Sequence, residues 1–255
     1  MFDIKEVYND YISHKNDEYL EKYKDNKGKF SASSAGTCFK KQYYNSINAP
    51  KEDMKRRSKR LLRLGTIVHK DLELAIKYHI NNYKHDNIEI LTEHEITIPH
   101  LNVIGHLDLA TVTENAPGVV KIEKSISISV YDFKTIGSYQ WRKRFGTKYG
   151  EKNPSIHYYM QLGTYAIGLA NEYDPKPVSE IALWWYNKDD SKMKYQFVNP
   201  SYIDMAHEYW SDLNEFITEY GDEILNMKPP GPEIPVQSWE CNYCAYEGMC
   251  KKGMI

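Results

Sequence analysis

Asp132 and Lys134 stand two residues apart near the end of a long apolar stretch that is rich in β-branched residues. If this stretch is a strand, the two side chains share one face, and Phe133 between them turns into the core. A carboxylate can hold a divalent cation, and a lysine can position an attacking water and offset negative charge at phosphorus. The pair therefore suits phosphodiester hydrolysis. The plainer alternative is a salt bridge at a solvated strand end, although burying charge there is costly.

Four further residues could complete such a site. Asp108 lies in an apolar stretch upstream, and two aspartates on neighbouring strands can converge on one hard cation such as Mg²⁺ or Mn²⁺. His69, within a helical pattern, could add an imidazole ligand. Gln161 and Tyr165 lie four apart, so a helix places them on one face, where they could hold a phosphate or orient the lysine. Taken singly, the last three are better explained by ordinary packing.

The four cysteines are unevenly placed, because Cys241, Cys244 and Cys250 share one short segment and Cys38 lies far upstream. Three thiols lack the fourth ligand of a tetrahedral site, and Cys38 supplies it if the fold brings the chain ends together. Thiolates suit iron–sulfur clusters or zinc rather than magnesium, so cysteines and aspartates should bind different metals. A disulfide is a poor explanation in a reducing cytosol. The spacing alone fits zinc as well as iron.

Positive charge is local in this chain, whose formal net charge is only −2. Net charge therefore neither supports nor excludes nucleic-acid binding. Residues 55–63 and 140–148 are basic, and the second segment adds an aromatic ring that can stack on a base. The candidate DNA contacts are Arg60, Arg63, Trp141, Arg142, Lys143 and Arg144. For residues 55–63 the alternative is the solvated face of a helix.

Hydrophobic periodicity predicts the elements that must position these residues. Helices are predicted over residues 3–24, 52–82, 155–171 and 200–226. The buried stripe of the second helix is expected to comprise Leu61, Leu62, Leu64, Val68, Leu72 and Ile76. Strands are predicted over residues 88–98, 103–112, 119–133, 179–187 and 193–198. Ser33 and Ser34 should cap a short helix that carries Cys38, residues 135–153 should form a loop, and the proline-rich tail from Pro229 should be irregular.

This order of elements predicts an α/β protein with a mixed central sheet flanked by helices. We expect a single domain over residues 1–255. Within it, residues 1–60 would form an N-terminal helical part, residues 61–200 the core, and residues 201–255 the C-terminal helix and cysteine tail.

The composition is that of an ordinary soluble protein, with 41% hydrophobic and 27% charged residues in 255. No stretch approaches the roughly 18 apolar residues of a membrane span. The N-terminus lacks the basic and apolar pattern of a signal peptide. We therefore expect a cytoplasmic protein that does not bind membranes.

In this order, the segments GTIVH, GHLD, YDFKT and QLGTY resemble the RecB-like nucleases of the PD-(D/E)xK superfamily. One cysteine before these segments and three after them resemble its iron–sulfur branch, which includes CRISPR-associated exonucleases and phage-encoded relatives. The resemblance covers about residues 31–250. It implies a restriction-endonuclease-like core with Gln161 and Tyr165 in the active site. It also implies that Lys134 is catalytic. At the position of Asp132 the family often has Glu, so this sequence departs from the family pattern there.

The resemblance further implies two cofactors. A catalytic Mn²⁺ or Mg²⁺ would be bound by His69, Asp108 and Asp132, and manganese should support activity at least as well as magnesium because imidazole is the softer ligand. A structural 4Fe–4S cluster would be bound by Cys38, Cys241, Cys244 and Cys250, and would join the N-terminal helices to the tail.

We therefore expect a metal-dependent deoxyribonuclease, an exonuclease that acts on DNA ends or single-stranded DNA. It would work in a prokaryotic cytoplasm or, if viral, in the host cytoplasm. A homo-oligomer and partners in recombination, replication or CRISPR adaptation are compatible with the resemblance. One alternative is a non-catalytic nucleic-acid-binding adaptor with a zinc or iron–sulfur clasp. Another is a zinc-clasped structural protein with no nucleic-acid role.

Overall fold

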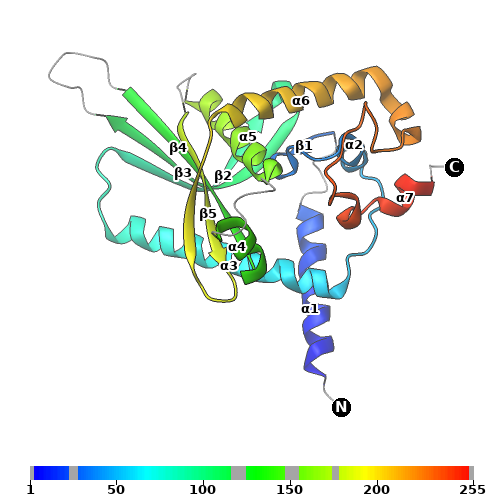
Figure 1. Ribbon diagram of the computed structural model, residues 1–255. Helices are drawn as coiled ribbons and strands as arrows, with labels where there is room; N and C mark the ends of the chain where they lie inside the picture. The colour runs from blue at the N-terminus through cyan, green and yellow to red at the C-terminus, as the bar shows by residue number, and fades with distance from the viewer. Residues whose placement is uncertain (1–2, 23–27, 116–124, 147–154, 174–177, 253–255) are drawn as a thin grey trace. The chain divides into compact units, whose positions relative to one another are not determined.

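The computed structural model describes residues 3–22, 28–115, 125–146, 155–173 and 178–252 (Figure 1). The chain divides into two compact units. We call residues 31–36 and 68–211 the sheet unit, and residues 1–30, 37–67 and 212–255 the terminal unit. No helix among the described residues combines the length and the apolar character needed to cross a bilayer.

A mixed β-sheet is the main feature of the sheet unit. The strands are β1 (Phe30–Ser31), β2 (Ile88–Ile98), β3 (Val103–Asn115), β4 (Ser125–Ile136), β5 (Val178–Asn187) and β6 (Met193–Val198). The pairs β2–β3, β3–β4 and β5–β6 are antiparallel, whereas β4 and β5 are parallel. A parallel pair requires a crossover connection, and α4 (Ser138–Phe145) and α5 (Ile156–Glu172) lie within it. The fold is thus the α/β arrangement with a mixed central sheet that the sequence predicted.

Helix α5 is the core helix of the sheet unit, because eleven consecutive residues from Tyr159 to Leu169 are buried. On one side, Gly168 lies against Ile96 of β2. On the other, Thr164 accepts a hydrogen bond at 2.8 Å from the indole of Trp210 in α6 (Ser201–Tyr220). Figure 1 shows α5 beside the strands. Contacts on both sides fix the helix that carries Gln161 and Tyr165.

The terminal unit brings segments from both ends of the chain together. Its elements are α1 (Ile4–Lys22), α2 (Phe39–Ser46), the first part of α3 (Arg56–Asn82), the end of α6, η3 (Gly221–Asn226), η4 (Cys241–Tyr243) and α7 (Glu247–Lys252). A small core contains Cys38, Tyr43, Phe216, Ile224 and Ile234. Polar contacts add to it, since Tyr43 donates to Asp222 at 2.6 Å. Ile234 of this core anchors the proline-rich tail to α2. The tail is not irregular throughout, as the sequence had suggested, because it includes η4 and α7.

Two local expectations are corrected by the structure. Residues 138–145 form α4 rather than a loop, because helix-forming Gln and Arg residues fill the segment and three basic residues lie in its last turn, where the helix dipole favours positive charge. Ser33 and Ser34 do not cap α2, because they lie in the short turn η1 (Ala32–Ser34), where Ser34 donates to the Ser31 carbonyl at 2.6 Å. Residues 147–153 of the expected loop and residues 119–124 of the expected third strand lie outside the described residues.

The predicted buried stripe of α3 is wrong in its first half, whereas Val68, Leu72 and Ile76 in its second half are half-buried. Leu61 and Leu62 are 48% and 60% exposed, and Leu64 is exposed as well. Within α3 the buried residue is Glu73, whose carboxylate forms ion pairs with Lys70 and Lys77. The spacing correctly indicated a long amphipathic helix, but an apolar stripe is buried only where a neighbouring element covers it.

Candidate active site and cysteine cavity

Two neighbouring antiparallel strands carry the acidic residues of the candidate active site. Asp108 lies on β3, and Asp132 and Lys134 lie on β4. The Asp108 carboxylate accepts a hydrogen bond at 2.7 Å from the backbone N–H of Phe133, which ties the two strands together at the site. Asp132 is 1% exposed and Phe133 6%. Both faces of β4 are therefore covered here, not only the face that carries Phe133.

The side-chain amide of Gln161 connects the carboxylate and the amine. Its Oε1 accepts a hydrogen bond from Lys134 Nζ at 3.0 Å, while its Nε2 donates to Asp132 Oδ1 at 3.0 Å and to Tyr165 Oη at 2.8 Å. Lys134 Nζ also lies 2.6 Å from Asp132 Oδ2 and 4.7 Å from the centre of the Tyr158 ring. The amide thus uses both of its N–H groups and its carbonyl inside the site.

His69 reaches the same carboxylates from α3. Its Nδ1 lies 3.6 Å from Asp108 Oδ2, and its ring packs edge-on against Phe133 with centroids 6.1 Å apart. Burial by itself lowers the pKa of His69, but the Asp108 and Asp132 carboxylates outweigh it, so that the pKa is raised. In the same way, burial favours a higher pKa for Asp108, yet His69 and Lys134 lower it overall.

Asp132 is the aspartate of the site whose negative charge is disfavoured by its surroundings. Burial, only partly opposed by Lys134, raises the pKa of Asp132 to about 7, and the negative charge of Asp108 acts in the same direction as burial. Burial favours a lower pKa for Lys134, but Asp132 and Asp108 outweigh it, and the pKa of Lys134 is raised. A buried carboxylate beside a half-buried one is stabilised by any added positive charge.

The donor set fits a hard divalent cation. Asp108 and Asp132 offer the carboxylate oxygens that Mg²⁺ and Mn²⁺ prefer, and His69 offers an imidazole that Mn²⁺ accepts readily. Within the described ranges, no three His, Cys, Asp or Glu side chains converge closely enough to hold an ion as they stand. Lys134 instead contacts Asp132 Oδ2, while His69 contacts Asp108. The structure therefore brings the three predicted ligands and Lys134 together as two adjoining pairs.

Glu93 is a third carboxylate near the site, and the sequence did not single it out. It lies on β2 between Thr92 and His94, which pair with Leu109 and Leu107, so that Glu93 is opposite Asp108. Its φ is 50°, which is uncommon for a residue other than glycine and often marks a functional position. Burial raises the pKa of Glu93, and the charge of Asp108 adds to the effect. Strand periodicity could not predict this position of Glu93, because the alternation of side chains along a strand carries no information about an unusual φ at one residue.

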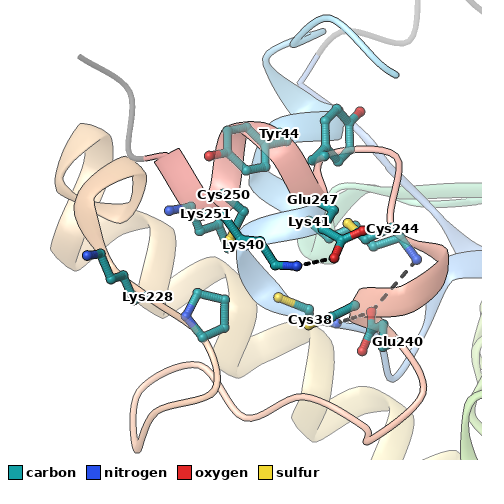
Figure 2. A pocket seen from close by; sticks show the side chains of 13 residues that line it. Cys38, Lys40, Lys41, Tyr44, Lys228, Glu240, Cys244, Glu247, Cys250 and Lys251 are labelled. Carbon is teal, nitrogen blue, oxygen red and sulfur yellow. Dashed lines mark hydrogen bonds and ion pairs between the residues drawn. The ribbon is translucent and has the colours of Figure 1, made fainter. Parts of the chain in front are cut away.

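The four cysteines line one cavity of about 220 Å³ in the terminal unit (Figure 2). Cys38 precedes α2, Cys241 begins η4, Cys244 follows η4, and Cys250 lies on α7. All four thiols are free. Glu240 links the two ends of the chain, because its Oε1 accepts a hydrogen bond at 2.8 Å from the backbone N–H of Cys38, 202 residues away in sequence. The upstream cysteine thus meets the C-terminal three.

The cavity gathers four thiols, but among the described residues no three of them stand close enough together to hold an ion as they are placed. Burial raises the pKa of Cys38 to about 12, and it also raises the pKa of Cys244 and Cys250. These thiols need a cation to displace their protons at neutral pH. A zinc ion would draw four sulfurs to about 2.3 Å from one point. A volume of about 220 Å³ is that of several water molecules at roughly 30 Å³ each.

The basic residues predicted to contact DNA divide between the two units. In the terminal unit, Arg60 donates to Asn9 Oδ1 at 2.7 Å and Arg63 lies 5.9 Å from the centre of the Tyr11 ring. In α4, Arg144 donates to Ser155 and lies 4.3 Å from the ring centre of Trp185.

The other three predicted contacts also lie on α4. Trp141 packs against Phe145 with ring centroids 4.9 Å apart. Arg142 and Lys143 are exposed. Within α4, these two side chains are the ones available to a phosphate, whereas Arg144 is held by packing.

Comparison with known proteins places the chain in a family. The model of the family described as the PD-(D/E)XK nuclease superfamily matches residues 99–251. This range includes Asp108, Asp132, Lys134 and the three C-terminal cysteines, whereas His69 and Cys38 lie before it. No curated protein sequence matches the chain.

Two solved structures are similar to the chain. The crystal structure of SSO0001 has 18% identity over 89% of this chain and 88% of that one, with a TM-score of 0.45. An alkaline exonuclease (LHK-Exo) from Laribacter hongkongensis has 12% identity over 80% of this chain and 93% of that one, with a TM-score of 0.43. Because the family model covers more than half of the sequence, the chain belongs to the PD-(D/E)XK nuclease superfamily.

Proposed function

We propose that this protein is a divalent-metal-dependent deoxyribonuclease that acts on DNA ends or single-stranded DNA. The observation that carries the proposal is the buried group in which Lys134, held by Gln161, lies against Asp132 beside Asp108. Membership of the nuclease superfamily supports phosphodiester hydrolysis. The preference for ends rests on the resemblance of the GTIVH, GHLD, YDFKT and QLGTY segments to RecB-like nucleases.

Each side chain has a distinct role in this proposal. Asp108, Asp132 and His69 would hold the cation, which when bound supplies a Lewis acid for the phosphate and a more acidic water. Lys134 is an ammonium at neutral pH, because the two aspartates raise its pKa. It therefore acts by charge and hydrogen bonding, not as a base. Gln161 keeps this ammonium beside the reacting phosphate.

We further propose that the cysteine cavity binds a 4Fe–4S cluster. Four free thiols from separate segments line it, and its volume of about 220 Å³ suits a group larger than one ion. Thiolate ligation suits iron–sulfur clusters. The cluster would join α2 to the tail, and zinc is the competing occupant.

One preparation tests both proposals. The full chain would be purified without oxygen, its iron and zinc contents and visible absorption measured, and end-labelled single- and double-stranded DNA incubated with it and Mn²⁺ or Mg²⁺. We expect iron with a brown colour, and cleavage that Mn²⁺ supports at least as well as Mg²⁺ does.

The variant Lys134→Ala is the matched control for catalysis. It should lose cleavage by about a hundredfold or more, as expected for a charge-stabilising group, while it keeps its iron and binds DNA. Cleavage that survives Lys134→Ala would rule out the proposed role of the amine. DNA binding without cleavage by the wild type in any metal would instead favour an adaptor, and zinc without iron would reject the cluster.

A further inference from the structure

Lys40 is a buried lysine on the wall of the cysteine cavity (Figure 2). It is 1% exposed, as deeply buried as the large core side chains. Its Nζ donates hydrogen bonds to the backbone carbonyls of Leu225 at 2.7 Å and Met227 at 2.6 Å, and lies 5.6 Å from the centre of the Tyr44 ring. The side chain is therefore held in one position, with its charged end away from water.

No carboxylate among the described residues forms an ion pair with Lys40. The buried Glu240, 2% exposed, lines the same cavity, but its Oε1 accepts from the Cys38 N–H at 2.8 Å and lies 3.7 Å from Lys41 Nζ. Glu247, also on the wall, forms an ion pair with Lys251. Two carbonyls accept from an ammonium that has three N–H groups. Lys40 thus holds a buried positive charge that the protein itself does not neutralise, which is costly unless an anion lies nearby.

An anionic occupant would supply the missing partner. Four thiolates carry more negative charge than the metal core they surround, so a cluster ligated by them is anionic, and nearby charge and hydrogen bonds to sulfur set its reduction potential. Positive charge beside the cluster favours its reduced form, because reduction makes the centre more negative. The wall also carries Lys228 and Lys251, but both are exposed, where water screens their charge.

We propose that Lys40 is a positioning residue of the cysteine site, whose buried ammonium compensates the negative charge of the thiolate-bound cluster. This charge slows the loss of the cluster from the protein and raises the reduction potential of the cluster. The inference rests on the proposed cluster. It names the positive group that stabilises an anionic centre inside the terminal unit. Lys40 follows Cys38 by two residues and lies on the first turn of α2. One short segment thus provides both a ligand and the charge that offsets it.

The test compares Lys40→Met with Lys251→Met in the full chain, purified without oxygen. Methionine keeps the length of the side chain and removes its charge. Lys251 is the matched control, because it lines the same cavity but its side chain is 70% exposed. The measurements are iron per chain, the rate of iron loss to a chelator, and the midpoint potential by spectroscopic titration.

We expect Lys40→Met to lose iron severalfold faster than the wild type, or to hold a cluster with a more negative midpoint potential. Lys251→Met should match the wild type. Equal iron retention and an unchanged potential in Lys40→Met would overturn the proposal, as would equal shifts in both variants. Lys40→Gln, which can still donate to the two carbonyls, separates charge from folding: rescue of both measurements by glutamine would show that the carbonyl contacts suffice and would overturn the role of the charge.

The outcome for the wild type separates this inference from the cluster proposal. Wild type with iron and an unaffected Lys40→Met refutes only the inference. Wild type with zinc alone refutes the cluster. In that case the rate of zinc loss is measured for Lys40→Met and Lys251→Met. Faster loss from Lys40→Met alone upholds the role of Lys40. Wild type that retains neither metal refutes the site and the role of Lys40 together.

Discussion

At the scale of single residues, the amide of Gln161 determines the geometry of the candidate active site. Without it, the Lys134 ammonium would be positioned mainly by its contact with Asp132, the carboxylate that must also be available to a cation. The amide carbonyl holds Lys134 while the amide N–H groups hold Asp132 and Tyr165. One side chain thus keeps the amine close to the carboxylate even when a cation competes for that carboxylate.

Replacing Gln161 by alanine is therefore expected to lower kcat for DNA cleavage by about 10- to 100-fold, the usual effect of losing a group that orients a ligand or catalyst. Affinity for DNA should change little. Tyr165→Phe should have a smaller effect, because the hydroxyl accepts only one of the two amide N–H groups. Steady-state cleavage of an end-labelled oligonucleotide, with circular dichroism to confirm folding, measures both variants. An unchanged kcat in a folded Gln161→Ala protein would contradict this assignment.

At the scale of elements, the strands were the most predictable part of the fold. The predicted bounds of β2 and β6 agree with the structure, because alternating β-branched residues identify a half-buried strand. The spacing of Gln161 and Tyr165 also correctly placed them on one helix face. Their hydrogen bonds could not be predicted, because these depend on how α5 lies against β4. Glu93 was missed for a related reason, since its positive φ is a local backbone feature with no periodic signal.

Helix α5 approaches its neighbours through two glycines that differ in what they touch. A Cβ at Gly163 would overlap the backbone carbonyl oxygen of Tyr202, so the start of α6 would have to move. A Cβ at Gly168 would lie 2.9 Å from both Cβ and Cδ1 of the buried Ile96, and the Cβ cannot move unless the backbone of β2 moves with it. Alanine in a helix gains about 1 kcal/mol over glycine, whereas overpacking costs typically about 1–3 kcal/mol.

We therefore expect Gly163→Ala to destabilise the protein by about 1–2 kcal/mol, and Gly168→Ala to destabilise it less, because the contact that its Cβ creates is longer. Urea unfolding followed by tryptophan fluorescence gives the free energy of unfolding of each variant. Because α5 carries Gln161 and Tyr165, Gly163→Ala should also cleave DNA more slowly at temperatures where it remains folded. A Gly163→Ala protein as stable as the wild type would show that α6 yields to the methyl group without cost.

At the scale of the whole molecule, the two kinds of site lie in different compact units. Asp108, Asp132, Lys134 and Gln161 belong to the sheet unit, and all four cysteines belong to the terminal unit. The sheet unit has a sheet and a helix with eleven consecutive buried residues to stabilise it. The terminal unit has a core cluster of five buried residues, one of which is Cys38 itself. Because Cys38 belongs to this core, a group bound at the cysteines would add to the stability of the terminal unit.

Losing one of the proposed cysteine ligands should therefore loosen the terminal unit and leave the sheet unit intact. In Cys250→Ser, backbone amide hydrogen exchange is expected to become at least about tenfold faster in residues 37–46 and 229–252, because opening of a unit follows its local stability. Exchange in β4 and α5 should stay close to that of the wild type. Hydrogen exchange measured by mass spectrometry resolves these segments in one experiment, and Gly163→Ala is the reciprocal control, with faster exchange expected in α5 and not in the tail. Faster exchange in β4 and α5 of Cys250→Ser would mean that the catalytic strands depend on the cysteine site for their stability, so that the site would support the active centre and not only the chain ends.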